Sequence, residues 1–276
     1  MKFEIVPAHE LTLAEQAIVF TKAFAGYLAG SIQMDAESLA RFLCAQGADL
    51  CYSRFVRASG ELVGFGYINR TGNMSRLAAM GVVPSARRAG TARHLLLHLV
   101  DEARKRRDHA MLLEVFEQNS GAHALYSSNG FREVTRLFGW RRKNDVDLPN
   151  AASDSLEEIS LIAASQTRST VDYPEIPWQI SRYAVAKLSA ARAFRVGDTV
   201  IVSGDPTSSP IRVHAFLNFS GKVDKITAAF SAVLQRFAGS EFFAPAIFPE
   251  PFGEQIFQPL GFTREPLNQF LMRRDL

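Results

Sequence analysis

Cysteine is scarce in this chain, which has only two, Cys44 and Cys51, among 276 residues. Two cysteines cannot make a disulfide framework, and neither has the neighbours of a metal-ligand motif. We therefore expect no metal site. We also expect both thiols to be reduced and buried as small apolar groups.

Long apolar runs are missing as well. No stretch approaches the roughly 18 consecutive apolar residues that a membrane-spanning helix requires, and residues 1–7 lack the apolar segment of a signal peptide. We expect a cytoplasmic protein that has no membrane partner. Hydrophobic residues still make up 47% of the chain, which provides a core for one large domain or two small ones.

A strong charge of either sign is also absent, because the net charge is only +3. This excess is too small to argue for nucleic-acid binding, so a DNA-associated protein is disfavoured. The charge is uneven, however. Residues 1–145 carry 19 lysines and arginines against 14 aspartates and glutamates, whereas residues 146–276 carry 12 against 14. The basic half is the one that suits a polyanionic ligand.

Residues 82–92 join an apolar strand to a long helix, expected at 91–107, through a basic turn that contains Gly90. The first N–H groups of a helix have no partner within it, and the helix dipole places partial positive charge there. Gly90 lets a ligand approach the backbone, and Arg87 and Arg88 add charges suited to phosphate. Such a turn can hold a pyrophosphate, although an ordinary turn with two solvated arginines has the same local pattern.

A second segment favours the pyrophosphate site. Its characteristic residues are Asn119, Ala122, Leu125, Tyr126, Gly130 and Phe131. Together with Arg87, Gly90 and Ala92 of the turn, they make residues 1–142 resemble the GCN5-related N-acetyltransferase (GNAT) superfamily. The resemblance implies an α/β fold, in which helices flank a mixed, mostly antiparallel sheet that contains one splayed parallel pair.

The resemblance also implies acetyl-coenzyme A as the acyl donor. The cofactor-binding residues that it implies are Met80, Gly81, Val82, Arg87, Arg88, Ala89, Gly90, Thr91, Ala92, Arg93 and Asn119. Backbone groups of residues 80–82 would contact the pantetheine arm and the oxyanion, at a bulge that Gly81 would ease. Asn119 would lie near the pantetheine, which is compatible with its capping the next helix.

Two residues are candidates for the chemistry. Tyr126 matches the family's tyrosine beside the sulfur and would protonate the departing thiolate; alternatively, it packs in the core with its hydroxyl bonded elsewhere. Glu114 interrupts an apolar strand expected at 110–116, so burial would raise its pKa and suit it as the base. Its segment, Leu-Glu-Val before Asn119, looks like that of the branch that acetylates protein N-termini, where the glutamate is the base. A structural carboxylate, with a water chain as the base, is the alternative.

The acceptor is specified less well. In this family the first two helices and their loop, here residues 20–35, shape the acceptor site. Phe24, Tyr27, Gln33 and Asp35 lie there, although the aromatic rings also suit the core and Asp35 suits a helix N-cap. We expect an N-acetyltransferase that acts by direct attack of a primary amine, of a small molecule or a peptide N-terminus. The alternative is a non-catalytic coenzyme A-binding sensor or scaffold.

The second half repeats the first when the chain is shifted by 131 residues. Gly130-Phe131 then falls on Gly261-Phe262, but the functional residues are replaced. The positions of Arg87, Arg88, Asn119 and Tyr126 are taken by Asn218, Phe219, Glu250 and Phe257. This copy, with strands that start near 156–163, is therefore not expected to bind coenzyme A.

We accordingly predict three parts: a catalytic GNAT domain at residues 1–143, a linker at 144–155 and a degenerate GNAT-like domain at 156–276. The linker assignment rests on its content of Asp, Asn, Ser and Ala. The second domain would wall the acceptor site or mediate self-association, which leaves a homodimer open.

Overall fold

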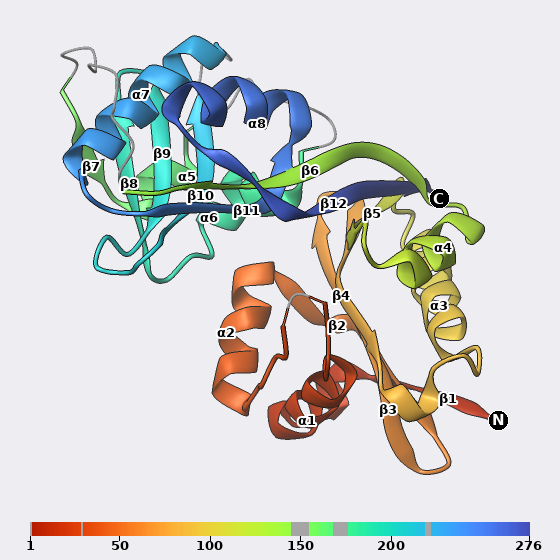
Figure 1. The fold of residues 1–276 in the computed structure, drawn as a ribbon. Coiled ribbons are helices and arrows are strands. Elements are labelled where there is room, and N and C mark those ends of the chain that lie inside the picture. Colours follow the sequence, from red (N-terminus) through yellow and green to blue (C-terminus); the bar gives the residue numbers. More distant parts are fainter. Residues whose placement is uncertain (1, 29, 145–154, 168–175, 219–221) are drawn as a thin grey trace. The chain divides into compact units, whose positions relative to one another are not determined.

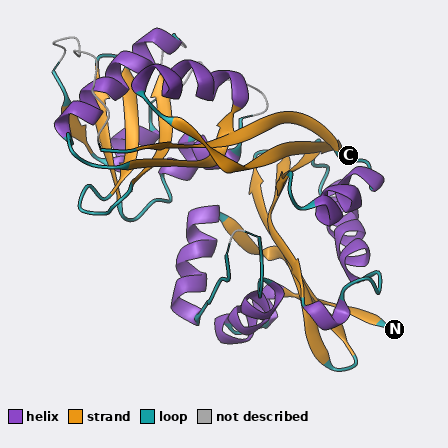
Figure 2. Cartoon of the chain, viewed as in Figure 1, coloured by secondary structure: helices purple, strands orange, loops and turns teal. Residues whose placement is uncertain are grey.

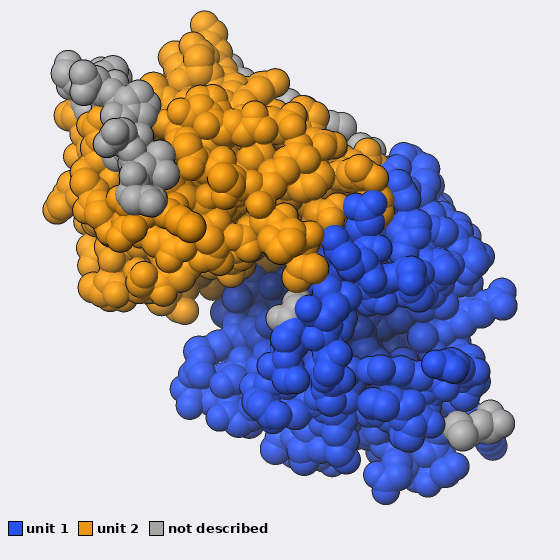
Figure 3. Space-filling model, in the orientation of Figure 1, with its two compact units in different colours: residues 1–133, 271–276 blue, residues 134–270 orange. Residues whose placement is uncertain are grey.

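A computed structural model of the chain describes residues 2–28, 30–144, 155–167, 176–218 and 222–276. The chain forms two compact units. Unit 1 comprises residues 1–133 and 271–276, and unit 2 comprises residues 134–270 (Figure 3). In both units helices lie on the two faces of a sheet (Figure 2).

Unit 1 has five strands in sequential order along its sheet, followed by the end of the last strand of the chain. The strands are β1 (Phe3–Pro7), β2 (Ala48–Ala58), β3 (Glu61–Thr71), β4 (Met74–Val82), β5 (Ala110–Phe116) and the end of β12 (Thr263–Asp275) (Figure 1). The first four pair antiparallel, whereas β4 and β5 are parallel.

Four α-helices cover this sheet: α1 (Leu13–Ala23), α2 (Ala36–Gln46), α3 (Thr91–Lys105) and α4 (Ser120–Ser128). Consecutive residues of β3 point to opposite faces of the sheet, so their neighbours show which helix covers which face. Phe65 stacks on Phe20 of α1, with ring centroids 5.0 Å apart, whereas a Cβ at Gly66 would lie 2.6 Å from Leu99 of α3. Helices α1 and α3 therefore pack on opposite faces.

Local sequence signals set the ends of α1 and α2. A capping box formed by Thr12 and Glu15 starts α1. The Asp35 carboxylate accepts a hydrogen bond from the Ser38 N–H at 2.7 Å and starts α2, as the sequence predicts. Gly47 ends α2 in the left-handed conformation. These caps fix both ends of the loop that the resemblance assigns to the acceptor site.

The parallel pair β4–β5 separates partway along its length. The two strands pair only from Met74 and Ala110 to Leu77 and Leu113. The register of β4 against β3 shifts at Ala78, between the pairs of Leu77 and Ala79, so the bulge lies there and not at Gly81. Gly81 has a different role: a Cβ there would lie 2.9 Å from both the Ala23 Cβ and the Phe65 ring. It allows α1 to pack closely on the sheet.

Unit 2 repeats this plan. Its sheet runs in the order β7 (Glu157–Ile159), β8 (Ala191–Val196), β9 (Thr199–Gly204), β10 (Ile211–Asn218), β11 (Phe242–Pro249) and β6 (Arg132–Arg142). Its α-helices are α5 (Leu161–Ser165), α6 (Arg182–Val185), α7 (Val223–Arg236) and α8 (Glu250–Phe257). The fourth and fifth strands are again the parallel pair. The prediction of two GNAT-like copies in tandem is confirmed.

The final strand of each sheet comes from the other half of the sequence. β6, which follows the first half, pairs antiparallel with β11 in unit 2. Residues 271–276 belong to unit 1, where the N–H of Leu276 donates to the carbonyl of His109 at 3.1 Å. The predicted domain boundaries at 143 and 156 remain predictions, and most of the predicted linker lies outside the described residues. The compact units are a separate division of the chain, which changes from unit 1 to unit 2 after residue 133 and back after residue 270.

Two local expectations are wrong. A strand was expected over 156–163, but β7 is short and α5 follows it, because the Ser160 hydroxyl accepts the Ala163 N–H and starts a helix. Cys44 and Cys51 are exposed rather than buried. Cys44 follows the buried Leu43 of α2, and the step of about 100° per residue turns it away from the core.

Within the described residues, no helix combines the length and apolarity needed to cross a bilayer. The same residues contain no cluster of three or more His, Cys, Asp or Glu side chains that could hold a metal ion.

Candidate active site

The turn between β4 and α3 presents a row of free backbone amides. Gly90 has φ 85° and caps α3 in the left-handed conformation. The first bond of the helix runs from the His94 N–H to the Gly90 carbonyl at 2.9 Å. Among the residues that the structure describes, the N–H groups of residues 88–93 form no hydrogen bond. Six consecutive donors at a helix start are suited to an anion with several oxygens.

Of the arginines around this turn, one holds the turn in place and two are exposed cations. Arg87 donates from Nε to the Val82 carbonyl at 3.1 Å and from Nη2 to the Ala23 carbonyl at 2.9 Å. Its guanidinium thus ties the turn to the end of α1. Arg88 and Arg93 are exposed, and within the described part of the chain neither pairs with a carboxylate. The charge available to a phosphate therefore comes from Arg88 and Arg93 in addition to the amides.

Thr91 fixes the first residue of α3. It is buried, and its hydroxyl donates to the Ala86 carbonyl at 2.9 Å. This contact closes the turn from inside, while Ala89 and Gly90 remain exposed on the outside. The amides of the turn are therefore held by a buried contact that does not use them.

Residues 80–82 border the gap between β4 and β5. Met80, Gly81 and Val82 pair with β3 on one side, whereas on the other side β4 has no partner beyond Leu77. Backbone groups on the open side are free to contact a ligand. This is the region that the resemblance assigns to the pantetheine arm and the oxyanion.

Three side chains meet at the other border of this region. Asn119 caps α4 by accepting the Ala122 N–H at 3.3 Å, and it is also hydrogen-bonded to Tyr27. The Tyr27 ring lies 6.1 Å from Phe116 at the end of β5. Burial raises the pKa of Tyr27, which the hydrogen bond to Asn119 partly offsets. Of the four acceptor-loop residues, Tyr27 is the one placed at this site; Phe24 packs on Phe20 in the core.

Tyr126 combines a buried ring with an unused hydroxyl. It is only 7% exposed, and its ring packs on Phe131 with centroids 5.8 Å apart. Burial, and to a smaller extent the nearby Tyr27, raise the pKa of Tyr126, so the phenol is protonated at neutral pH. Its hydroxyl forms no hydrogen bond within the described residues, whereas the hydroxyl of buried Tyr67 donates to Gln16 at 2.9 Å. Tyr126 therefore holds a proton that it can donate.

Glu114 has a cationic partner that the sequence argument did not include. Arg76 of β4 donates from Nη2 to Glu114 Oε2 at 2.7 Å and from Nε to both carboxylate oxygens at 3.0 and 3.1 Å. Both side chains are 5% exposed. Glu114 is thus not a lone carboxylate in an apolar strand, because Arg76 compensates its charge. No local sequence signal marks this pair; it depends on the register of β4 against β5.

Comparison with known proteins identifies the fold. Residues 21–131 match the acetyltransferase (GNAT) family. This part of the chain is a GNAT domain. The curated relatives include the [ribosomal protein bS18]-alanine N-acetyltransferase of Escherichia coli strain K12, which is 38% identical over 77 residues. That match covers 28% of this chain, and the chain spans about half (52%) of the relative's length.

Solved structures match the whole tandem arrangement. A putative acetyltransferase from Pyrococcus horikoshii has a TM-score of 0.67 at 14% identity, over 99% of this chain and 89% of that chain. A tandem GNAT protein from the clavulanic acid biosynthesis pathway has a TM-score of 0.63 at 15% identity, over 99% and 98%. At these identities the likeness concerns the fold alone, and it extends over both units of this chain.

The second GNAT copy uses the replaced positions for structure. Asn218 is buried and donates to Thr199. Glu250 pairs with Arg264 at 3.1 Å, and Phe257 is fully buried, 5.5 Å from the Trp140 ring. Phe219 lies outside the described residues. The copy keeps the splayed strands, because β10 pairs with β11 only at residues 211–212 and its register against β9 shifts at His214.

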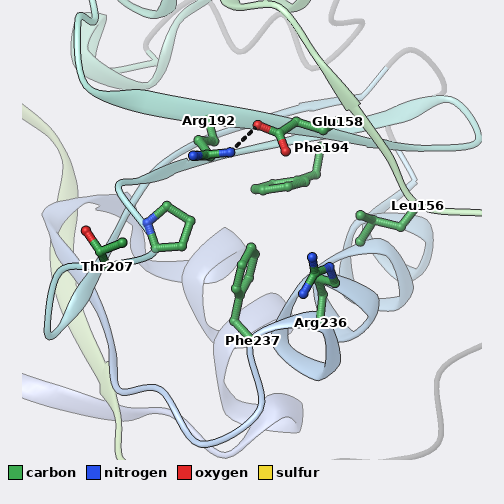
Figure 4. A pocket seen from close by; sticks show the side chains of 8 residues that line it. Leu156, Glu158, Arg192, Phe194, Thr207, Arg236 and Phe237 are labelled. Atoms are coloured by element: carbon green, nitrogen blue, oxygen red, sulfur yellow. Dashed lines mark hydrogen bonds and ion pairs between the residues drawn. The ribbon is translucent and has the colours of Figure 1, made fainter.

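Unit 2 also contains a pocket of about 360 Å³ (Figure 4). Phe194 and Phe237 form apolar walls, and Arg192 and Arg236 lie at its border, with Arg192 paired to Glu158 at 2.8 Å. None of its lining residues comes from β10 or β11. It is therefore not the counterpart of the splayed site in unit 1.

Proposed function

We propose that the first GNAT domain transfers an acetyl group from acetyl-coenzyme A to a primary amine by direct attack. The single observation that carries this proposal is the row of free amides at residues 88–93, which includes Gly90 in the left-handed conformation. It fits the pyrophosphate of coenzyme A, because each amide is an oriented donor and the helix dipole adds to the field.

The chain's own groups have distinct roles in this proposal. The pyrophosphate would be held by the amides with Arg88 and Arg93, and the pantetheine by residues 80–82 and Asn119. Arg87 would act by bracing the turn. Ala89, Gly90, Thr91 and Ala92 would contribute through their backbone.

Two protons must move during the transfer. Tyr126 would donate one to the departing thiolate, and its burial keeps that proton in place until it is needed. Glu114 would receive the proton that the amine loses, directly or through water. Backbone N–H groups of β4 beside the gap would stabilise the oxyanion.

The acceptor is proposed by class. The relative named above is a [ribosomal protein bS18]-alanine N-acetyltransferase, so a peptide N-terminus is one candidate and a small-molecule amine is the other. We also infer a cytoplasmic location, with no role for nucleic acid or membrane, and a homodimer remains an open prediction.

One observation favours a different function. The Glu114 carboxylate is held by Arg76, as in a structural ion pair. A non-catalytic coenzyme A-binding sensor or scaffold would not require a free base. This is the second candidate.

Two measurements separate these functions. Coenzyme A binding is measured by isothermal titration calorimetry, and thiol release from acetyl-coenzyme A is measured with pooled small amines and N-terminal peptides. Tyr126→Phe should lower turnover by about 10²–10⁴-fold with little change in coenzyme A affinity. The control Tyr183→Phe alters a half-exposed tyrosine of unit 2 and should change neither. Binding without thiol release would favour the sensor, and absence of binding would refute both functions.

A further inference from the structure

The ion pair between Arg76 and Glu114 lies at the point where β4 and β5 separate. The last paired residues of the two strands are Leu77 and Leu113. Arg76 is therefore the residue before the last pair on one strand, and Glu114 is the residue after it on the other. The three hydrogen bonds between them span the beginning of the gap that residues 80–82 border.

The same guanidinium reaches a third element. Arg76 Nη1 donates to Gln46 Oε1 at 3.1 Å, and Gln46 is the last residue of α2. The end of α2 is itself fixed, because Asn69 of β3 donates to the carbonyls of Gln46 and Gly47 at 3.2 and 2.9 Å. Arg76 thus connects the helix that borders the acceptor loop to the carboxylate proposed as the base.

This arrangement differs from the cluster around the buried Asp108. Asp108, just before β5, is bonded by Arg70 at 2.7 Å and by the Ser75 hydroxyl at 2.6 Å. That cluster lies where the strands start to pair, at the opposite end from the gap. It stabilises the paired segment, whereas Arg76 and Glu114 lie beside the proposed chemistry.

Arg76 provides the side-chain contacts of Glu114. Arg76 of β4 is its cationic partner, and α2 contributes only the neutral Gln46 through Arg76. Over the described ranges, no other side chain donates to the carboxylate or pairs with it. Both carboxylate oxygens are therefore held by one guanidinium, and such charge-assisted, bidentate pairs fix geometry as well as adding energy.

We propose that Arg76 is a positioning residue of the acetyl-transfer site, which holds the Glu114 carboxylate at the point where β4 and β5 separate and links it to α2. This inference rests on the proposed function for its catalytic meaning. Arg76 acts through Glu114 and does not itself exchange protons.

The contact between Arg76 and Glu114 can be measured without activity. The full chain, labelled with ¹³C at glutamate side chains, is studied by NMR at one pH, and the Glu114 signal is the one that Glu114→Gln removes. In Arg76→Gln this signal should shift and broaden, because the carboxylate has lost the partner that holds both of its oxygens, whereas Arg70→Gln should leave it in place. The proposal is overturned if the Glu114 signals of Arg76→Gln and the wild type coincide.

Activity gives an independent readout. In Arg76→Gln kcat should fall with little change in the KM for acetyl-coenzyme A, and Arg76→Lys, which keeps a cation, should recover part of that loss. The control Arg70→Gln removes an arginine from the Asp108 cluster and should leave kcat in place. If Arg76→Gln folds but has the wild-type kcat, the positioning role fails; if the wild type releases no thiol, the proposed function fails and the NMR result decides this inference alone.

Folding of the variant needs its own control. Removing Arg76 leaves a buried charge, which is strongly destabilising. The double variant Arg76→Gln/Glu114→Gln removes both charges and should melt closer to the wild type than Arg76→Gln does. If Arg76→Gln does not fold, Arg76→Lys supplies the comparison: an unchanged kcat together with an unchanged Glu114 signal would overturn the proposal.

Discussion

Replacing Gly90 with alanine tests whether the turn before α3 is a binding device or an ordinary turn. Gly90 has φ 85°, and a Cβ added there would have no heavy atom within 4 Å. The cost to stability is therefore conformational and not steric. A left-handed backbone costs a residue with a Cβ about 1–2 kcal/mol.

Gly60 offers a matched control in the same unit. It lies in the turn between β2 and β3, has φ 84°, and also has no atom within 4 Å of an added Cβ. Gly60→Ala and Gly90→Ala should therefore lose similar stability, which at about 2–4 °C per kcal/mol is a small decrease in Tm for each. Thermal melting followed by circular dichroism measures this decrease in Tm.

Coenzyme A binding should separate the two variants. The methyl group at residue 90 would project from the exposed side of the turn, among the free amides of residues 88–93. Relaxation away from the left-handed conformation would also turn those amides. We expect Gly90→Ala to weaken coenzyme A binding at least tenfold, or about 1.4 kcal/mol, with no change in Gly60→Ala. Equal affinity in both variants by calorimetry would refute the assignment of the pyrophosphate to this turn.

Three further predictions concern Tyr27, Asp108 and residues 271–276. Tyr27→Phe removes the hydrogen bond to Asn119 and should weaken coenzyme A binding by about 0.5–1.5 kcal/mol in calorimetry; no change would show that Tyr27 does not shape the pantetheine region. Burial favours a higher pKa for Asp108, but the hydrogen bond from Ser75 and the neighbouring arginines outweigh it, so its pKa is lowered. A lowered pKa in the folded state gives stability that is present above the unfolded value, about 4, and lost as pH falls through the folded value. The Tm of the wild type should hence fall more steeply below about pH 4 than that of Asp108→Asn, and parallel curves would contradict this. Deleting residues 271–276 removes two fully buried side chains and should lower the free energy of unfolding of unit 1 by at least about 4 kcal/mol in urea titration; an unchanged midpoint would mean that unit 1 does not need this segment.

Local patterns were sufficient for most of the elements and for the glycine turn before α3. The order of strand, turn and helix at residues 82–92 depends on a glycine, a helix start and a short apolar run, all within a few residues. The caps at Asp35 and Asn119 are equally local. These features could be predicted because their physics involves neighbours in the chain.

The features that could not be predicted depend on strand pairing. Whether Arg76 meets Glu114 depends on the register of β4 against β5, and the sequence between them does not fix that register. Likewise, the sequences of β6 and β12 predict strands whichever sheet these strands join. Nothing in those two sequences indicates that β6 belongs to unit 2 and that the end of β12 belongs to unit 1. Gly81 was assigned to a bulge, whereas its close neighbours Ala23 and Phe65 come from distant segments.

A comparison of Tyr126 with its counterpart in the second copy bears on its role. In unit 2 the position is Phe257, which packs among aromatic rings and has no polar group. In unit 1 the ring is buried and the hydroxyl forms no hydrogen bond to a described residue, yet this hydroxyl is not among the buried polar atoms that lack a partner. The hydroxyl of Tyr126 therefore lies where water or a substrate can reach it, which the proposed transfer of its proton to the departing thiolate requires.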